Sequence, residues 1–287
     1  MLHQWHGTID LIRRALAEDE AAADATSGLL PAGMRGTAIM LAKQNGVIAG
    51  VEVGLAVFRE VDLDVAWFAS LDDGTRVEAG QHIVTIKGRL ASILRAERTA
   101  LNFVQRMSGI ATATRAYVDE IAGTNAALID TRKTLPGLRL LDKYSVRMGG
   151  GRNHRMSLAD GVLIKDNHIA AAATIRETIA DLVARARATA PHTVRIEVEC
   201  DTLEQVRQSV EAGADIVMLD NMSIEIMREA VSMCAGRVLT EASGGVTLAA
   251  VRTIAETGVD FVSAGAITHS VQALDISLDV TPDGAGA

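Results

Sequence analysis

The residues from Asp130 to His168 concentrate positive charge in an otherwise acidic chain. This segment has eight arginines or lysines against four aspartates, hence a formal charge of +4, whereas the whole chain carries −8 at pH 7. The cations are Arg132, Lys133, Arg139, Lys143, Arg147, Arg152, Arg155 and Lys165, and His154 and His168 lie among them. A pI near 5.4 argues against a general nucleic-acid binder. The segment therefore predicts a site for a small anionic ligand.

Two adjacent cations, Arg132 and Lys133, directly follow the apolar run 126–131. Arginine can hold an anion through two parallel hydrogen bonds, and lysine acts as a point charge. The stretch MGGGRNHR then places three glycines before His154 and Arg155, where the backbone can approach a ligand closely. The alternative for both stretches is a solvated loop with incidental charge, since no GxGxxG or Walker A signature accompanies them.

Lys165 lies near the end of the run 161–166 (GVLIKD). A lysine that enters a protein interior is costly to bury unless it is paired. We therefore regard Lys165 as a candidate anion ligand or Schiff-base nucleophile. The alternative is a side chain that extends out of the strand end into solvent.

The run RIEVEC (195–200) alternates apolar and charged residues. Its apolar face should meet helices, which directs Glu197 and Glu199 inward, where cations of neighbouring strands can pair with them. Glu199 is nearer the strand end and is the functional candidate, whereas Glu197 is the structural one. Together with Asp220, Glu199 can bind ribose hydroxyls or a magnesium shell. Simple ion pairing is the alternative.

These polar residues follow short apolar runs that alternate with helical patterns. The runs cover 126–131, 161–166, 195–200, 215–220, 237–245 and 260–266, and the helical patterns cover 173–190, 202–214, 223–235 and 247–259. Functional groups follow nearly every run, which favours an α/β barrel, with all strand ends on one face, over an open doubly wound sheet. Six runs and one uncertain strand predict an incomplete barrel. The last two runs end in EASGGVT and SAGAIT, whose exposed backbone N–H groups suit a phosphate or, alternatively, only make tight turns.

The first hundred residues show another pattern. Turn signals at Asn45-Gly46 and Asp73-Gly74 separate alternating runs, as in antiparallel strands. Residues 90–123 predict one long helix, or two helices broken near Gly109. We therefore expect a separate N-terminal α+β unit with its boundary near Ser108.

The composition limits the class of protein. Hydrophobic residues make up 48% of the chain and aromatic residues 3%, so the core should consist of aliphatic side chains. No apolar run reaches the ~18 residues of a membrane span, and no signal peptide is predicted, so we expect a cytoplasmic protein. The two cysteines predict reduced thiols, and no H-E-x-x-H or C-x-x-C pattern indicates structural zinc.

Taken in order, the motifs resemble those of the quinolinate phosphoribosyltransferases (nicotinate-nucleotide pyrophosphorylase, carboxylating). The matching stretches are ERTALNFVQRMSGIAT, DTRKTLPGLRLLDKYSVRMGGGRNHR, LIKDNHI, IEVE, LDNMS, EASGG and SAGAIT. The resemblance covers nearly the whole chain and is weakest over the first thirty residues and the tail. Two departures are Leu135, where a Thr is expected, and EDEAAADATS near residue 18, which lacks the usual Gly.

The resemblance implies an N-terminal α/β sandwich over 1–108, joined by the C-terminal segment 269–287, and an incomplete, about seven-stranded α/β barrel over 109–268. It implies a homodimer in which Arg98 enters the partner's site, and it implies Mg²⁺ near Glu199 and Asp220. The residues that fall on the quinolinate pocket are Arg98, Arg132, His154, Arg155 and Lys165. Those that fall on the phosphoribosyl pyrophosphate side are Lys133, Glu199, Asp220, Ser243, Gly244 and Gly265. Lys165, Glu199 and Asp220 are the catalytic candidates.

The implied reaction joins quinolinate to phosphoribosyl pyrophosphate and releases pyrophosphate and CO2, giving nicotinate mononucleotide for NAD biosynthesis. Both substrates are anionic, which explains why the cations gather in one segment. Three alternatives remain open at this point: a relative that acts on another acid such as nicotinate, a Schiff-base lyase that uses Lys165, and a non-catalytic protein that binds a phosphate ligand.

Overall fold

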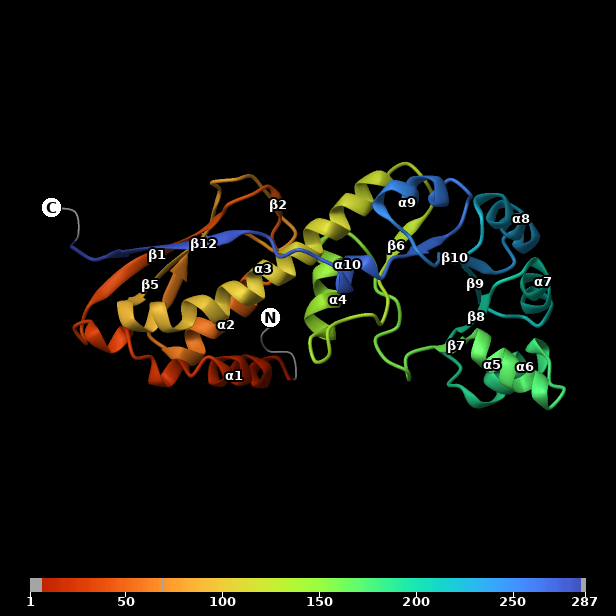
Figure 1. Ribbon diagram of the computed structural model, residues 1–287, viewed down its shortest axis with the longest axis horizontal. Coiled ribbons are helices and arrows are strands. Elements are labelled where there is room, and N and C mark those ends of the chain that lie inside the picture. The colour runs from red at the N-terminus through yellow and green to blue at the C-terminus, as the bar shows by residue number, and fades with distance from the viewer. Residues whose placement is uncertain (1–6, 69, 285–287) are drawn as a thin grey trace. The chain divides into compact units, whose positions relative to one another are not determined.

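The computed structural model describes residues 7–68 and 70–284, which form two compact units (Figure 1). The first unit comprises Met1–Ala113 and Val271–Ala287, and the second comprises Thr114–Ser270. The domain division predicted from the sequence has its boundaries after residues 108 and 268. None of the described helices is both long enough and apolar enough to cross a membrane.

An antiparallel sheet forms the centre of the first unit (Figure 1). Its four strands lie in the order β12-β1-β5-β3, and alternate residues of β1 are buried. The strands are β1 (Arg35–Ala42), β3 (Ala66–Phe68), β5 (His82–Arg89) and β12 (Ile276–Pro282), and a small ladder pairs β2 (Gly46–Val47) with β4 (Arg76–Val77). The helices are α1 (Thr8–Glu18), η2 (Ala21–Ala23), η3 (Ser27–Leu29), α2 (Val51–Val61) and the first part of α3 (Leu90–Glu120). The antiparallel strands predicted for the first hundred residues are confirmed.

Helix α3 is continuous through Gly109, so of the two alternatives the single long helix is correct. A Cβ atom at Gly109 would lie 2.1 Å from the carbonyl oxygen of Gln272. Glycine is therefore needed here for the close approach of the segment that precedes β12, and it does not end the helix.

A six-stranded parallel sheet forms the centre of the second unit, in the order β6-β11-β10-β9-β8-β7. The strands are β6 (Ala127–Ile129), β7 (Val162–Ile164), β8 (Ile196–Cys200), β9 (Ile216–Asp220), β10 (Leu239–Ser243) and β11 (Phe261–Ser263). Each lies inside one of the six predicted apolar runs. An isolated parallel bridge between Ile129 and Arg152 adds a rudimentary neighbour beside β6. The prediction of an incomplete α/β barrel is confirmed.

The helices of the second unit follow the strands in the expected alternation (Figure 1). They are α4 (Arg139–Met148), α5 (Asp166–Thr174), α6 (Ile179–Thr189), α7 (Leu203–Glu211), α8 (Ile224–Cys234), α9 (Leu248–Ala255) and α10 (Ala266–His269). The single helix predicted over 173–190 is wrong. The chain breaks after Thr174, Arg176 has a positive φ of 63°, and Thr178 starts α6 with a capping box in which its hydroxyl accepts from Asp181 N.

Both cysteines are free and buried, in agreement with the expected thiols. Cys200 ends β8 on its helix-facing side, where its Sγ lies 3.4 Å from Ser209 Oγ of α7. Ile196 and Val198 on the same face are fully buried. The opposite face of β8 carries Glu197 and Glu199, as the alternation predicted.

Candidate functional site

A cavity of about 510 Å³ lies at the carboxyl ends of the parallel strands. Its charged lining residues are Arg132, Lys133, His154, Arg155, Lys165, Glu199, Asp220 and Glu241, and the loop Ser243, Gly244 and Gly245 completes the β10 side. The loops after β6, β7, β9 and β10 supply most of these residues, because parallel strands end on the same face of the barrel. Nearly all of the site residues predicted for this unit therefore converge on one cavity.

The cationic side of the cavity contains a buried donor for which no hydrogen-bond partner is found among the described residues. The Nε atom of Arg132 is buried and has no hydrogen-bond partner among the described residues. Arg155 donates from Nη1 to the carbonyl oxygen of Gly161 at 3.0 Å, and burial lowers the pKa of its guanidinium, helped by the nearby charge of Arg132. Two guanidinium groups in close proximity repel one another. An anion between them would reduce this repulsion and would supply an acceptor for the unpartnered Nε of Arg132.

Glu199 and Asp220 lie on the acidic side of the cavity, in addition to Glu241. Lys165 Nζ lies 2.6 Å from Glu199 Oε2, and Asn221 Nδ2 donates to Asp220 Oδ2 at 2.7 Å. Two carboxylates that leave further coordination positions to substrate phosphates are a donor set that suits Mg²⁺, which binds few protein ligands and prefers oxygen. The residues therefore fit the magnesium site that the sequence suggested.

The loop after β10 has a backbone that only glycine tolerates. Gly244 has a φ of +94°, and a Cβ atom there would lie 2.3 Å from Asn221 Oδ1. Gly245 also has a positive φ, and no atom lies within 4 Å of its would-be Cβ. The loop therefore packs tightly against the end of β9 and leaves open space on the side of Gly245, as a loop that surrounds a phosphate requires.

Two predicted residues do not line this cavity. Gly265 lies against Lys133 and His269, because a Cβ atom at this position would be 3.0 Å from Lys133 Cδ and 3.1 Å from the His269 ring. Its glycine therefore leaves room for Lys133, which itself lines the cavity. Arg98 belongs to α3 in the first unit, and its entry into a partner's site stays a prediction.

A buried ion pair supports the loop that carries His154. Asp130 and Lys143 are 0% and 1% exposed and form a direct salt bridge. Asp130 also accepts from Asn153 Nδ2 at 2.6 Å and from His154 N at 2.9 Å, and Lys143 donates to the His154 carbonyl oxygen at 2.9 Å. The sequence showed these two residues only as members of a charged segment, because nothing in their spacing identifies a pair thirteen residues apart.

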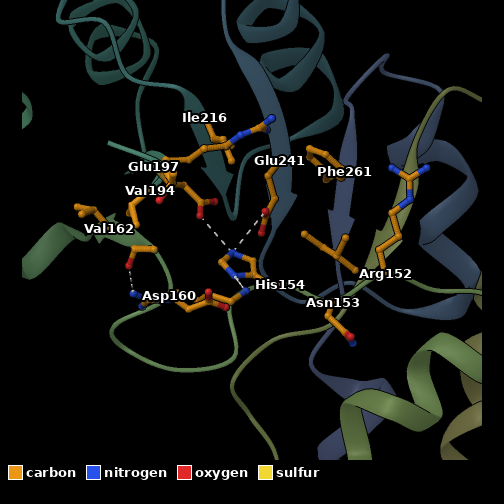
Figure 2. A pocket seen from close by; sticks show the side chains of 15 residues that line it. Arg152, Asn153, His154, Asp160, Val162, Val194, Glu197, Ile216, Glu241 and Phe261 are labelled. Atoms are coloured by element: carbon orange, nitrogen blue, oxygen red, sulfur yellow. Dashed lines mark hydrogen bonds and ion pairs between the residues drawn. The ribbon is translucent and has the colours of Figure 1, made fainter. Parts of the chain in front are cut away.

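A second cavity of about 500 Å³ lies at the amino ends of the strands (Figure 2). Its lining includes the first residues of β7, β9 and β11 and the residues just before β8. His154, Arg155 and Glu241 line both cavities. These residues therefore form part of the wall between the carboxyl-end and the amino-end cavity.

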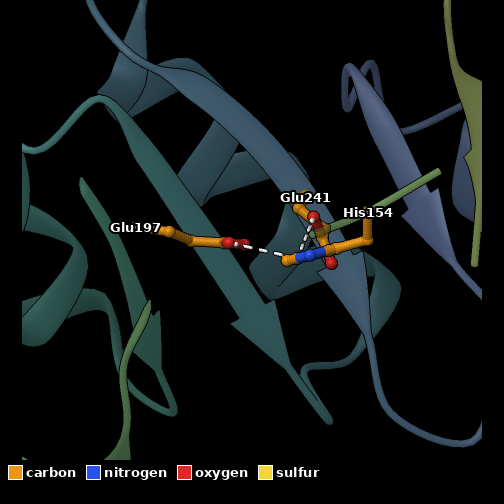
Figure 3. A group of neighbouring side chains, drawn as sticks. All are labelled: His154, Glu197 and Glu241. Atoms are coloured by element: carbon orange, nitrogen blue, oxygen red, sulfur yellow. Dashed lines mark ion pairs between the residues drawn. The ribbon is translucent and has the colours of Figure 1, made fainter. Parts of the chain in front are cut away.

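Glu197 of β8 and Glu241 of β10, which lie on either side of β9 in the sheet, both approach His154 (Figure 3). His154 Nε2 lies 3.1 Å from Glu197 Oε2 and 3.6 Å from Glu241 Oε2. Glu241 was not predicted as a site residue. The signal was present, because β10 alternates as β8 does and Glu241 shares its inward face with Ser243. The Nε2 atom of His154 thus faces the glutamates, and its contact with quinolinate stays a prediction.

Comparison with known proteins gives matches over both units. The model of the quinolinate phosphoribosyl transferase N-terminal domain matches residues 24–108, and that of the C-terminal domain matches residues 110–279. A probable nicotinate-nucleotide pyrophosphorylase [carboxylating] of Bacillus subtilis is 42% identical, over 94% of this chain and 92% of the relative. The nicotinate-nucleotide pyrophosphorylase [carboxylating] of Mycobacterium leprae is 46% identical, over 94% of this chain and 96% of the relative.

The structure leads to the same family. The crystal structure of NadC from Streptococcus pyogenes superposes with a TM-score of 0.91 at 39% identity, covering 95% of this chain and 96% of that one. Two matched domain models and relatives above 40% identity over most of both lengths leave one assignment. The chain belongs to the quinolinate phosphoribosyl transferase family.

Proposed function

We propose that the protein transfers the phosphoribosyl group of phosphoribosyl pyrophosphate to quinolinate, with loss of CO2, and forms nicotinate mononucleotide and pyrophosphate. The observation that carries the proposal is the cavity in which cations, three carboxylates and a glycine loop meet at the strand ends. The names of the M. leprae and B. subtilis relatives support the same reaction.

In this proposal the cations divide between two anionic substrates. Arg132, Arg155 and Lys165 bind the two carboxylates of quinolinate, and His154 packs beside them. The unpartnered Nε of Arg132 supports this role, because a carboxylate would supply its missing acceptor. Lys165 is held toward the cavity by Glu199, so that its ammonium can contact the acid without being buried alone.

The co-substrate takes the other side of the cavity. Lys133 neutralises the pyrophosphate, and the loop of Ser243 and Gly244 surrounds the 5′-phosphate, with Gly265 leaving room for Lys133. Glu199 and Asp220 face the ribose and would hold Mg²⁺. When bound, the ion neutralises charge on the departing pyrophosphate.

The chemistry follows from this arrangement. The pyridine nitrogen attacks C1 of the ribose as pyrophosphate leaves, and Glu199 and Asp220 stabilise the cationic ribosyl group electrostatically. The bond to nitrogen makes the ring an electron sink, so the 2-carboxylate leaves as CO2 and the ring carbon takes a proton. Arg132 and Arg155 contribute mainly by fixing the ring so that its nitrogen points at the ribose.

The Schiff-base alternative is disfavoured by one contact. Lys165 Nζ lies 2.6 Å from Glu199 Oε2, and an ion-paired ammonium has no lone pair with which to attack a carbonyl. The nicotinate alternative predicts that one carboxylate suffices. Turnover measured with quinolinate and with nicotinate in parallel, with the nucleotide product identified by mass spectrometry, distinguishes the two. Formation of the nucleotide from quinolinate supports the proposal. Formation of the nucleotide from nicotinate but not from quinolinate contradicts it.

We also propose a homodimer in which Arg98 of one subunit completes the cavity of the other. The resemblance in ERTALNFVQRMSGIAT supports it. Arg98→Ala and Lys165→Ala should each be inactive. When the two variants are mixed and allowed to exchange subunits, half of the dimers have one intact site, so roughly a quarter of wild-type activity should return. No recovery in mixtures shown to contain heterodimers would contradict the shared site.

A further inference from the structure

The cluster of His154, Glu197 and Glu241 resembles a metal site, but its hydrogen bonds give it another role. The backbone N–H of Arg155 donates to His154 Nδ1 at 2.7 Å. Nδ1 is therefore the acceptor nitrogen, and Nε2 carries the proton that faces the glutamates. A nitrogen that carries a proton cannot bind a metal ion. The ring instead donates to Glu197, with Glu241 Oε2 close by at 3.6 Å.

The cluster must hold an additional proton. Glu197 and Glu241 are 4% and 1% exposed, and each has a buried Oε1 without a hydrogen-bond partner among the described residues. Burial, followed by the charge of Glu197, raises the pKa of Glu241 well above its usual range, with Asp130 acting in the same direction. The hydroxyl of Ser263, from β11, lowers the pKa only in part. Glu241 is the more deeply buried of the two glutamates and lies farther from the His154 donor, so we assign the additional proton to Glu241.

The proposed reaction needs such an acid. When CO2 leaves, the electron pair of the broken bond stays on the pyridine carbon, which must then take up one proton. Among the charged side chains that line the carboxyl-end cavity, arginines do not release protons at neutral pH, and Lys165 is paired with Glu199. Lys133 is assigned to the pyrophosphate in the proposed function, and the Nε2 proton of His154 is directed at Glu197. Glu241 is the buried group there that holds a transferable proton.

We propose that Glu241 is the general acid that protonates the pyridine carbon after decarboxylation. This inference rests on the proposed function. The bond between the ring carbon and the carboxylate breaks, CO2 leaves, and the carbon takes the proton of the Glu241 carboxyl group. Glu241 is left as a carboxylate and regains its proton from water in the amino-end cavity, which it also lines (Figure 2). The second cavity thus supplies protons from the side opposite the substrates.

His154 and Glu197 act as positioning residues for this acid. Glu197 lines the amino-end cavity, and its carboxylate accepts from the ring at 3.1 Å, which fixes the imidazole plane (Figure 3). The ring in turn lies 3.6 Å from Glu241 Oε2 and limits how far that carboxyl group can turn. The proton of Glu241 is therefore kept in the wall between the two cavities.

The test compares Glu241→Gln with wild type and with Glu211→Gln, an exposed glutamate of α7. Glutamine matches the shape and neutrality of the protonated acid, so the fold should survive, but it cannot supply a proton. We expect kcat with quinolinate and phosphoribosyl pyrophosphate to fall by roughly 10²- to 10⁴-fold, with both KM values nearly unchanged. The solvent deuterium isotope effect on kcat should rise, because protonation becomes rate-limiting. Glu211→Gln should behave as wild type.

Three outcomes decide the matter. An active wild type with an equally active Glu241→Gln overturns the general acid but leaves the proposed function intact. A lower kcat with an unchanged isotope effect also overturns it, because a structural role moves only the rate. A wild type without turnover overturns the proposed function and this inference together. Independently, the resting enzyme at pH 7 should show the infrared carbonyl band of a protonated carboxylic acid that Glu241→Gln lacks, and the absence of that band would contradict the proposal.

Discussion

Replacing Lys143 by Met tests how the buried ion pair supports the loop of His154. Lys143 and Asp130 are almost fully buried. Burial raises the pKa of Asp130 and lowers that of Lys143, and in both cases this effect is larger than the opposing effect of the partner's charge. Lys143→Met leaves Asp130 as a buried carboxylate without its cation. Breaking a buried pair in this way costs about 3–5 kcal/mol of unfolding free energy.

The loss of unfolding free energy in Lys143→Met can be measured by calorimetry. For a unit the size of Thr114–Ser270, a loss of 1 kcal/mol lowers Tm by about 2–4 °C, so Lys143→Met should lower it by roughly 6–20 °C. The matched control is the double variant Asp130→Asn with Lys143→Met. It has no buried charge, and its asparagine keeps an acceptor for His154 N, so much of the lost stability should return. A loss below about 1 kcal/mol, or a double variant as unstable as the single one, would refute the reasoning.

The loss should also depend on pH. Burial raises the pKa of Asp130, and the charge and hydrogen bond of Lys143 oppose this effect. We expect Lys143→Met to raise the pKa of Asp130 further above its unfolded value, so the folded variant binds more protons between the two values. Stability therefore rises as the pH falls through the raised pKa. The difference in unfolding free energy between variant and wild type should shrink from pH 8 toward the ordinary aspartate range near pH 4. A difference that grows on acidification would contradict the assignment.

Two further substitutions test the cavity itself. Arg132→Ala should raise KM for quinolinate by roughly 10- to 150-fold, which corresponds to the loss of one charge-assisted hydrogen bond, while KM for phosphoribosyl pyrophosphate stays nearly constant. An equal rise of both KM values would show that Arg132 does not select the acid. Gly244→Ala should raise KM for phosphoribosyl pyrophosphate and lower Tm, because its Cβ would lie 2.3 Å from Asn221 Oδ1. Gly245→Ala also places an alanine at a positive φ but makes no steric clash, so it is the control for the clash and should lower Tm less than Gly244→Ala.

The strands and the carboxyl-end cavity were predictable because local sequence determines both. Short apolar runs end in polar residues, and in a parallel barrel those ends must share one face. The alternation in RIEVEC was sufficient to direct Glu197 and Glu199 inward, as β8 shows. The charges around Arg132 and Lys165 then had to surround the same space.

Features that depend on tertiary contacts were not predictable. The low helix propensity of Gly109 suggested a break in the helix, but α3 continues through it. The glycine is there because a larger residue would clash with the carbonyl oxygen of Gln272. The pattern over 173–190 predicted one helix, yet the turn at Arg176 ends it. The alternation of β10 could have directed Glu241 inward, but its proximity to His154 was not predictable, because the two residues lie far apart in sequence and only the folded barrel brings them together.

The most direct test of the central claim is the release of CO2 from quinolinate labelled in its 2-carboxylate. We predict stoichiometric release of labelled CO2 with nicotinate mononucleotide and pyrophosphate, and only when phosphoribosyl pyrophosphate and Mg²⁺ are both present. Pyrophosphate formation without labelled CO2, or no reaction with quinolinate while another acid turns over, would contradict the account.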